Sequence, residues 1–225
     1  MSTHLPSSPG NQDQDQDQDQ ANDYLALLDY RRQVLSLYHE VRELAGTDPF
    51  LAHAYWRQFR GTLYGQHVQS PLNAAQRANF TGLRYYPYNS AYRFTAQVLL
   101  DSRQEGRGIG TSRDSVISFH RFGVVELPFG KLEVYWLEGY GGGVFLPFRD
   151  GTCGDTTYGG GRYLLDTVKG ADLDSGAGGN EMILDFNFAY HPSCHYNPYW
   201  DCPLAPPPNR LKARIEAGEM SYPGP

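Results

Sequence analysis

The sequence has few cysteines, little positive charge and no long apolar run, and each absence excludes a class of protein. Three cysteines in 225 residues are too few for a disulfide-based scaffold. The formal net charge of −6 argues against nucleic acid or an anionic membrane surface as the main partner, because both bind concentrated positive charge. No run approaches the roughly 18 apolar residues of a membrane span.

The N-terminus also lacks the features of a secretory signal. Residues 1–10 contain neither a positively charged region nor an apolar core. We therefore expect a soluble cytoplasmic protein that does not associate with a membrane. In a reducing cytosol its cysteines would remain mostly as thiols.

Aromatic residues and glycine are abundant, and they favour a β-rich fold. The chain contains 17 Tyr, 11 Phe, 25 Gly and 15 Pro, which favours strands joined by many turns. Short apolar or alternating segments separated by turn residues predict an antiparallel sandwich or partly open barrel rather than parallel βαβ units. The expected strands cover residues 92–100, 116–122, 124–128, 132–137, 144–148, 164–167 and 182–188, with a charged loop at 104–114 and a final strand or short helix near 211–215.

The first third of the chain has helical signals instead. Apolar residues recur at three- and four-residue spacing from Leu27 to Leu44, and Gly46 is a natural stop. Asp48-Pro49 is typical of the start of a second helix to about residue 60, and Asn73 with Gln76 has capping-box spacing. We expect an α+β protein whose N-terminal helices pack on the sheet. Its parts would be a disordered Gln/Asp-rich leader (1–22), a helical segment (23–82) and a β-rich domain (83–221).

A series of ordered motifs identifies a family. They are Ser70-Pro-Leu72, Phe80-Thr-Gly-Leu83, Phe148 to Gly154, Thr157-Tyr158, Gly161-Arg162-Tyr163, Asp185-Phe-Asn187, Ala189-Tyr190, Cys194 with Tyr196, Cys202-Pro-Leu204 and Ala217-Gly-Glu219. With these motifs the chain resembles the bacterial domain-of-unknown-function family numbered 1684, over about Tyr24 to Glu219. The resemblance implies no activity. His191 and His195 replace residues usual in that family, so a mechanism using them would be peculiar to this chain.

Polar side chains are densest among aromatics and glycines between residues 144 and 204, which is typical of a ligand pocket. We expect a small-molecule binding module in which Arg162, after three glycines, holds an anionic group on the ligand. The expected pocket residues are Asp150, Thr152, Tyr158, Arg162, Asp185, Asn187, Tyr190 and Tyr196.

Two alternatives use the same residues. Asp150 and Asp185 each follow a strand-like run, so they could act as general acid and base in a hydrolase or isomerase. Alternatively, Arg162 neutralises one of these carboxylates and the polar residues only fasten loops together, as in a structural or interaction protein.

Cysteine and histidine near the C-terminus suggest further chemistry. His191, Cys194, His195 and Cys202 are zinc-ligand types, but their spacing contains no C-x-x-C pair. Cys194 and Cys202 could instead form a disulfide in an oxidising compartment, or Cys194 could pair with a histidine as a nucleophile. No motif indicates NAD, flavin, PLP or haem, so we expect no cofactor.

Overall fold

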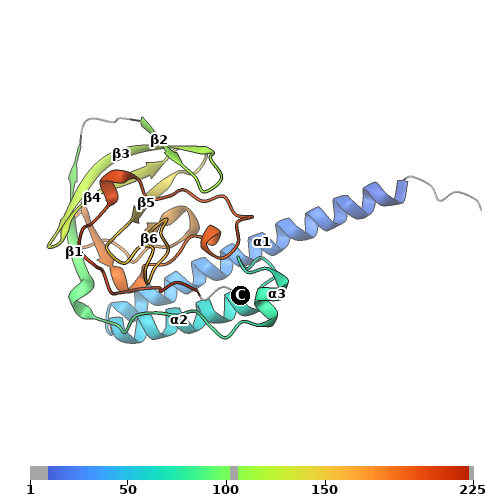
Figure 1. The fold of residues 1–225 in the computed structure, drawn as a ribbon, viewed down its shortest axis with the longest axis horizontal. Helices are drawn as coiled ribbons and strands as arrows, with labels where there is room; N and C mark the ends of the chain where they lie inside the picture. Colours follow the sequence, from blue (N-terminus) through green and yellow to red (C-terminus); the bar gives the residue numbers. More distant parts are fainter. Residues whose placement is uncertain (1–9, 102–105, 223–225) are drawn as a thin grey trace, which may run out of the picture.

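Two helices that run in opposite directions lie against a curled antiparallel sheet (Figure 1). The computed structural model describes residues 10–101 and 106–222. The helices are α1 (Gly10–Ala45), α2 (Pro49–Gln66) and the short α3 (Ala74–Ala78). This arrangement confirms the predicted α+β class. Within the described residues, no helix has the length and apolar composition that crossing a bilayer requires.

Local capping signals place two of the helix starts where the sequence predicts them. The Asp48 side chain accepts a hydrogen bond from the Leu51 backbone N–H at 3.0 Å, and proline fills the first turn. Asn73 and Gln76 form the reciprocal capping box, with both hydrogen bonds at 2.9 Å. Burial then decides the length of α2, because the helix continues past residue 60 to bury Leu63 and Tyr64.

α1 begins earlier than the sequence suggests. α1 (Gly10–Ala45) starts within the segment 1–22 that we predicted as a leader, and Figure 1 shows it projecting beyond the sheet. Glutamine is a good helix former, and extending a helix that packing has already fixed orders only one residue at a time. Residues 1–9 of the predicted leader lie outside the described residues. The division of the chain at residues 22 and 82 stays a prediction.

Within the described residues, seven strands form one antiparallel sheet that curls into a half-barrel (Figure 1). Its order is β6-β5-β4-β3-β1-β7, and β2 pairs with β3 off this path. The strands are β1 (Arg93–Leu100), β2 (Gly106–Gly110), β3 (Val116–Leu127), β4 (Gly130–Leu137), β5 (Gly143–Phe148), β6 (Arg162–Asp166) and β7 (Glu181–Asp185).

Glycine explains two places where the strands differ from expectation. The segments expected at 116–122 and 124–128 are one strand, with a pairing irregularity between Arg121 and Gly123. A Cβ at Gly123 would lie 2.5 Å from the Val98 side chain, so glycine here permits close strand approach rather than a turn. Likewise β2 forms inside the expected loop, where a Cβ on Gly108 would meet the Val116 side chain at 2.4 Å.

The ends of the predicted β region also differ. β7 stops at Asp185, because the Asp185 side chain accepts from the Asn187 backbone N–H and starts a 3₁₀ turn at Phe186–Phe188. Residues 211–215 form neither a strand nor a helix. Leu211 and Ile215 are nevertheless buried, at 3% and 1% exposure, so their apolar spacing predicts burial without predicting a regular element.

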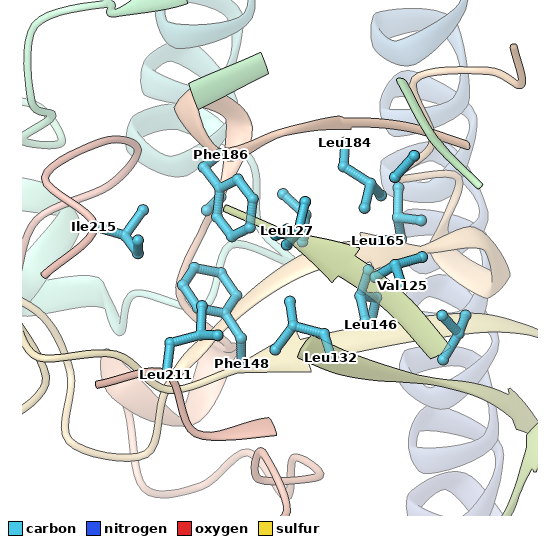
Figure 2. Packing of buried hydrophobic residues seen from close by; sticks show 14 of the residues in the cluster. Val125, Leu127, Leu132, Leu146, Phe148, Leu165, Leu184, Phe186, Leu211 and Ile215 are labelled. Carbon is cyan, nitrogen blue, oxygen red and sulfur yellow. The ribbon is translucent and has the colours of Figure 1, made fainter. Parts of the chain in front are cut away.

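The main core consists of buried side chains from the sheet strands and the C-terminal segment (Figure 2). Phe148 and Phe186 meet edge to face there, with ring centroids 5.1 Å apart, and Leu211 and Ile215 of the C-terminal segment close the cluster. A second core joins the helices to the segments after β6 and β7. Its buried members include Leu37, Val41, Trp56, Ala171, Leu173 and Phe188.

Asn209 fastens the C-terminal segment to the sheet. Its side chain donates to the carbonyls of Glu133 and Pro147, at 2.9 and 2.8 Å, and accepts from the Glu133 backbone N–H at 2.8 Å. Its carbonyl accepts from the Arg149 backbone N–H at 2.8 Å. From this anchor the chain continues past the ends of β5 and β6, which places residues 215–219 beside the predicted site.

Candidate functional site

Asp150 lies in a closed network at the end of β5. The Thr152 hydroxyl is 2.9 Å from both carboxylate oxygens, and the Ile215 backbone N–H donates at 2.7 Å. Arg162, the first residue of β6, places its Nη2 3.3 Å from Oδ1 of Asp150. Both charged side chains are 0% exposed. Each carboxylate oxygen of Asp150 is therefore occupied by partners from within the chain.

Arg162 anchors the C-terminal segment. Its guanidinium donates to the carbonyl oxygens of Ile215, at 2.9 Å, and Ala217, and it lies over the Phe148 ring at 5.0 Å. Burial lowers the pKa of Arg162, and the neighbouring Asp150 opposes that effect. Gly161 allows this placement, because a Cβ there would lie 2.5 Å from the Phe148 carbonyl oxygen. The guanidinium is enclosed, in contrast to the ligand-holding group that we expected.

Asp185 is the centre of a second network, at the end of β7. It accepts from the Asn187 side-chain amide at 2.7 Å and from Arg93 Nη1 at 3.2 Å. Asn187 in turn exchanges two hydrogen bonds with the backbone of Asn89, at 2.8 and 2.9 Å. Burial raises the pKa of Asp185, and hydrogen bonds from Asn187 and Arg93 oppose it. Among the described residues, this network and that of Asp150 have no hydrogen-bonding partner in common.

Glu219 is the centre of a third network, which sequence reasoning did not identify. Its carboxylate accepts from Arg60 Nη2 and from the His191 backbone N–H, both at 2.9 Å, and from the Tyr196 hydroxyl. Its side chain is 1% exposed. Burial raises the pKa of Glu219, whereas the Arg60 charge lowers it. The motif at 217–219 is the signal that marks this residue, but nothing in the sequence names Arg60 as its partner.

Aromatic rings enclose the Arg60 guanidinium. It lies 4.9, 4.8 and 5.0 Å from the ring centroids of Trp56, Tyr64 and Tyr190. Cation–π attraction to these rings lowers the cost of burying the charge. Tyr190 and Tyr196, two of the expected pocket residues, thus both lie at the buried Arg60–Glu219 pair.

His191 is buried between the Glu219 network and Tyr158. Its Nε2 accepts from the Tyr158 backbone N–H at 3.2 Å, so its proton is assigned to Nδ1. That Nδ1 lies 3.9 Å from Oε2 of Glu219 and has no hydrogen-bonding partner among the described residues. Burial, with His195 as a second cause, lowers the pKa of His191 well below its usual range. The imidazole is therefore neutral at pH 7 and holds the Tyr158 backbone in place.

His195 and Cys194 lie on a 3₁₀ turn, Ser193–His195, next to Tyr158. The His195 ring centroid is 4.3 Å from that of His191 and 5.0 Å from that of Tyr158. Burial lowers the pKa of His195 to about 4. The Tyr158 hydroxyl lies 3.9 Å from Cys194 Sγ. All three cysteines are free thiols, and the Cys202 thiol is a hydrogen-bonding neighbour of Cys194.

The residues considered for zinc do not assemble as a metal site. Within residues 10–101 and 106–222, no group of three or more His, Cys, Asp or Glu side chains could hold a metal ion. Two of the nitrogens needed are already in use, because His191 Nε2 and His195 Nε2 accept from the backbone N–H groups of Tyr158 and Tyr222 at 3.2 and 3.1 Å.

Solvent reaches few of the expected pocket residues. Asp150, Thr152, Arg162, Asp185, Asn187 and Tyr196 are buried, whereas Tyr158 and Tyr190 are half-buried. Tyr158 is adjacent to half-buried Cys194 and His195, and Arg149 donates from Nε to the Gly160 carbonyl at 3.3 Å beside it. We call Arg149, Tyr158, Cys194 and His195 the Tyr158 edge. Burial and Cys194 raise the pKa of Tyr158 to about 12, against a lowering by Arg149.

Two surface hollows lie on the helical side of the molecule. One, of about 250 Å³, is lined by Gln33, Tyr55, Gln58, Phe59, Thr62 and Leu63. A more open one, of about 480 Å³, is lined by residues of α2 and the segment 77–82. Neither is lined by any expected pocket residue.

Comparison with known proteins places the candidate site inside a recognised family region. The family described as "Protein of unknown function (DUF1684)" matches residues 78–220. Among solved structures, an uncharacterised protein of Haloarcula marismortui, determined in solution by NMR, is 32% identical, with a TM-score of 0.51. The similarity covers 73% of this chain and 89% of that one. No curated protein matches the sequence. The whole Tyr158 edge lies within the matched range, whereas Arg60 precedes it.

Proposed function

The chain belongs to the DUF1684 family of proteins of unknown function, and we propose that it is a small-molecule binding module whose ligand contacts the Tyr158 edge. One observation carries the proposal. At this edge, half-buried polar and aromatic side chains lie directly on a rigid buried network, since His191 holds the Tyr158 backbone and is itself fixed beside Glu219. Binding sites commonly combine such accessible side chains with a supporting network of buried residues that fixes their positions.

The edge favours a small planar or aromatic ligand that carries a negative group. Tyr158 and His195 pack on each other, with ring centroids 5.0 Å apart, and both are half-buried, so such a ligand can stack on the part of these rings that solvent reaches. Arg149 supplies positive charge beside them, whereas the Arg162 charge is enclosed and paired with Asp150. We therefore assign to Arg149 the anion-holding role that the sequence suggested for Arg162.

The other hypotheses use the buried residues differently. General acid or base catalysis by Asp150 or Asp185 requires a carboxylate oxygen that reaches a substrate, and both side chains are 0% exposed. Asp150, with Thr152 and Arg162, supports a positioning role beneath the edge, because the Thr152 hydroxyl lies 2.9 Å from the hydroxyl of Thr157, the residue before Tyr158. Tyr196 contributes through Glu219, which also holds His191. Asp185 and Asn187 instead position the backbone of Asn89. The remaining alternative is a protein without a ligand, in which these networks only join segments of the chain. The experiment below distinguishes it from a binding module.

Native mass spectrometry of the full-length protein tests the proposal, with a thermal-shift screen of small aromatic carboxylates and phosphates. We expect a bound mass or a stabilising compound with the natural sequence. Tyr158→Ala and Arg149→Ala should each weaken the affinity for this ligand by about tenfold or more. The control Tyr140→Ala, which changes a fully exposed tyrosine, should bind the ligand with unchanged affinity. Equal retention by all three variants, or no ligand from either method, would overturn the assignment.

A further inference from the structure

Two side-chain groups are hydrogen-bonding neighbours of the sulfur of Cys194. They are the Cys202 thiol and the Tyr158 hydroxyl, which lies 3.9 Å away. Ser112 fixes Cys202, because its hydroxyl accepts from the Cys202 backbone N–H at 3.1 Å and its own N–H donates to the Cys202 carbonyl at 2.9 Å. Two cysteines eight positions apart in sequence are thus held as neighbours by a residue that follows β2.

The two sulfurs differ in access. Cys194 is half-buried on its 3₁₀ turn, whereas Cys202 is 4% exposed. Thiol–disulfide exchange needs this asymmetry, because an accessible thiolate must attack first and a neighbouring thiol must then release the product. The binding hypothesis includes Cys194 in the Tyr158 edge but assigns no chemical reaction to either sulfur.

We propose that Cys194 and Cys202 form a dithiol site that reduces small disulfides, with Cys194 as the nucleophile and Cys202 as the resolving thiol. The inference deepens the proposed function and rests on it, because the disulfide would bind at the Tyr158 edge. In the first step the Cys194 thiolate attacks a disulfide, forming a mixed disulfide and releasing one thiolate. In the second, Cys202 gives up its proton, attacks Cys194 Sγ and releases the other half. In total, one small disulfide becomes two thiols and the protein gains the Cys194–Cys202 bond.

The electrostatics of the pair suit these roles. The hydrogen bond from Cys202 is the largest effect that lowers the pKa of Cys194, to about 6, so Cys194 is mainly a thiolate at pH 7. The same hydrogen bond, with burial, raises the pKa of Cys202, which keeps its proton until exchange begins. Cys153 provides an internal contrast, because burial raises the pKa of its thiol.

Peptide mapping after oxidation tests the proposal on the full-length protein. Cleavage after Lys and Arg puts Cys194 and Cys202 in one peptide, residues 170–210, and Cys153 in another, residues 150–162. After treatment of the reduced protein with oxidised glutathione, we expect the first peptide to lose two hydrogens. Cys202→Ser should instead accumulate one glutathionyl group on Cys194, and the matched control Cys153→Ser should behave like the natural sequence. If Cys202→Ser has a lower melting temperature than the natural sequence, Cys202→Ala is used in its place.

Alkylation rates are a second test, because a cysteine with a purely structural role would not react faster than an ordinary thiol. At pH 7, iodoacetamide should modify Cys194 about tenfold or more faster than Cys153, and Tyr158→Phe should slow Cys194 without changing the melting temperature. Equal rates at the two cysteines, or no mixed disulfide in the Cys202 variants, would overturn the proposal. Ligand retention by Cys194→Ser would then show that the binding function stands without the redox site.

Discussion

Arg60 of α2 donates a hydrogen bond to Glu219 at 2.9 Å, across 159 residues of sequence, with both side chains buried. The pair joins the helical layer to the C-terminal segment that closes the sheet core. Glu219 also accepts from the His191 backbone. The same carboxylate therefore links the helices to the segment that carries the Tyr158 edge.

Glu219→Gln should destabilise the protein by about 3 kcal/mol, because the amide can still accept hydrogen bonds but leaves the buried Arg60 charge unpaired. Urea unfolding measures the change. Glu126→Gln is the control, because Glu126 and its partner Lys131 form an ion pair at the surface, with side chains 55% and 68% exposed. This variant should lose less than about 1 kcal/mol of stability. Similar costs for the two variants would contradict the role of the buried pair.

Asp150→Asn and Arg162→Met should each cost about 3 kcal/mol, since each leaves the other group charged and enclosed. The double variant should cost less than the sum of the two by at least about 1 kcal/mol, because removing both charges leaves neither one uncompensated. Urea unfolding of the natural protein, both single variants and the double variant measures this coupling. Strict additivity would mean that the two side chains act independently.

Gly161→Ala should destabilise the protein by about 2 kcal/mol or more. Gly161 has φ +99°, and a Cβ would lie 2.5 Å from a backbone oxygen, so both conformation and space disfavour alanine. Gly159→Ala is the matched control two residues away, where the nearest atoms to a Cβ are 4.0 Å distant. Its melting temperature should change little, and an equal loss at both positions would contradict the steric argument.

Stability should fall as the pH drops from 6.5 to 4, partly because of His53. Burial lowers the pKa of His53 to about 4 from its usual 6.5, so the unfolded chain binds a proton in this window while the folded chain does not. His53→Phe should reduce the loss of stability between pH 7 and pH 4 by up to about 3 kcal/mol. Urea midpoints at both pH values measure it. His39→Gln, at an exposed position, should leave the loss unchanged.

Much of the fold follows from short-range sequence signals. The Asp48 cap and the Asn73–Gln76 capping box act within four residues, and the structure forms both. Glycine was misleading because its role depends on distant neighbours. Gly123 permits close approach to Val98 on β1, although in the sequence it resembles a break between two strands.

The candidate site was only partly predictable for the same reason. The sequence brings Asp150, Thr152 and Arg162 to attention, but it cannot show that backbone groups of residues 215–217 occupy them. Arg149 lies inside the motif from Phe148 to Gly154, but nothing in the sequence separates it, or Ser112, from other polar residues. Tyr158 is singled out by the polar and glycine residues next to it in the sequence, whereas its neighbours in the fold include Cys194, 36 positions away. Its role in ligand binding stays a prediction.

The Arg60–Glu219 pair has a consequence for synthesis of the chain. Translation at roughly 5–20 residues per second separates the appearance of these partners by roughly 10–30 s. During that interval the helices exist without the carboxylate that neutralises their buried guanidinium, and without the C-terminal residues that close the core of the sheet. Contacts of such long sequence separation also slow folding. Completion of the native state therefore waits until Glu219 has left the ribosome.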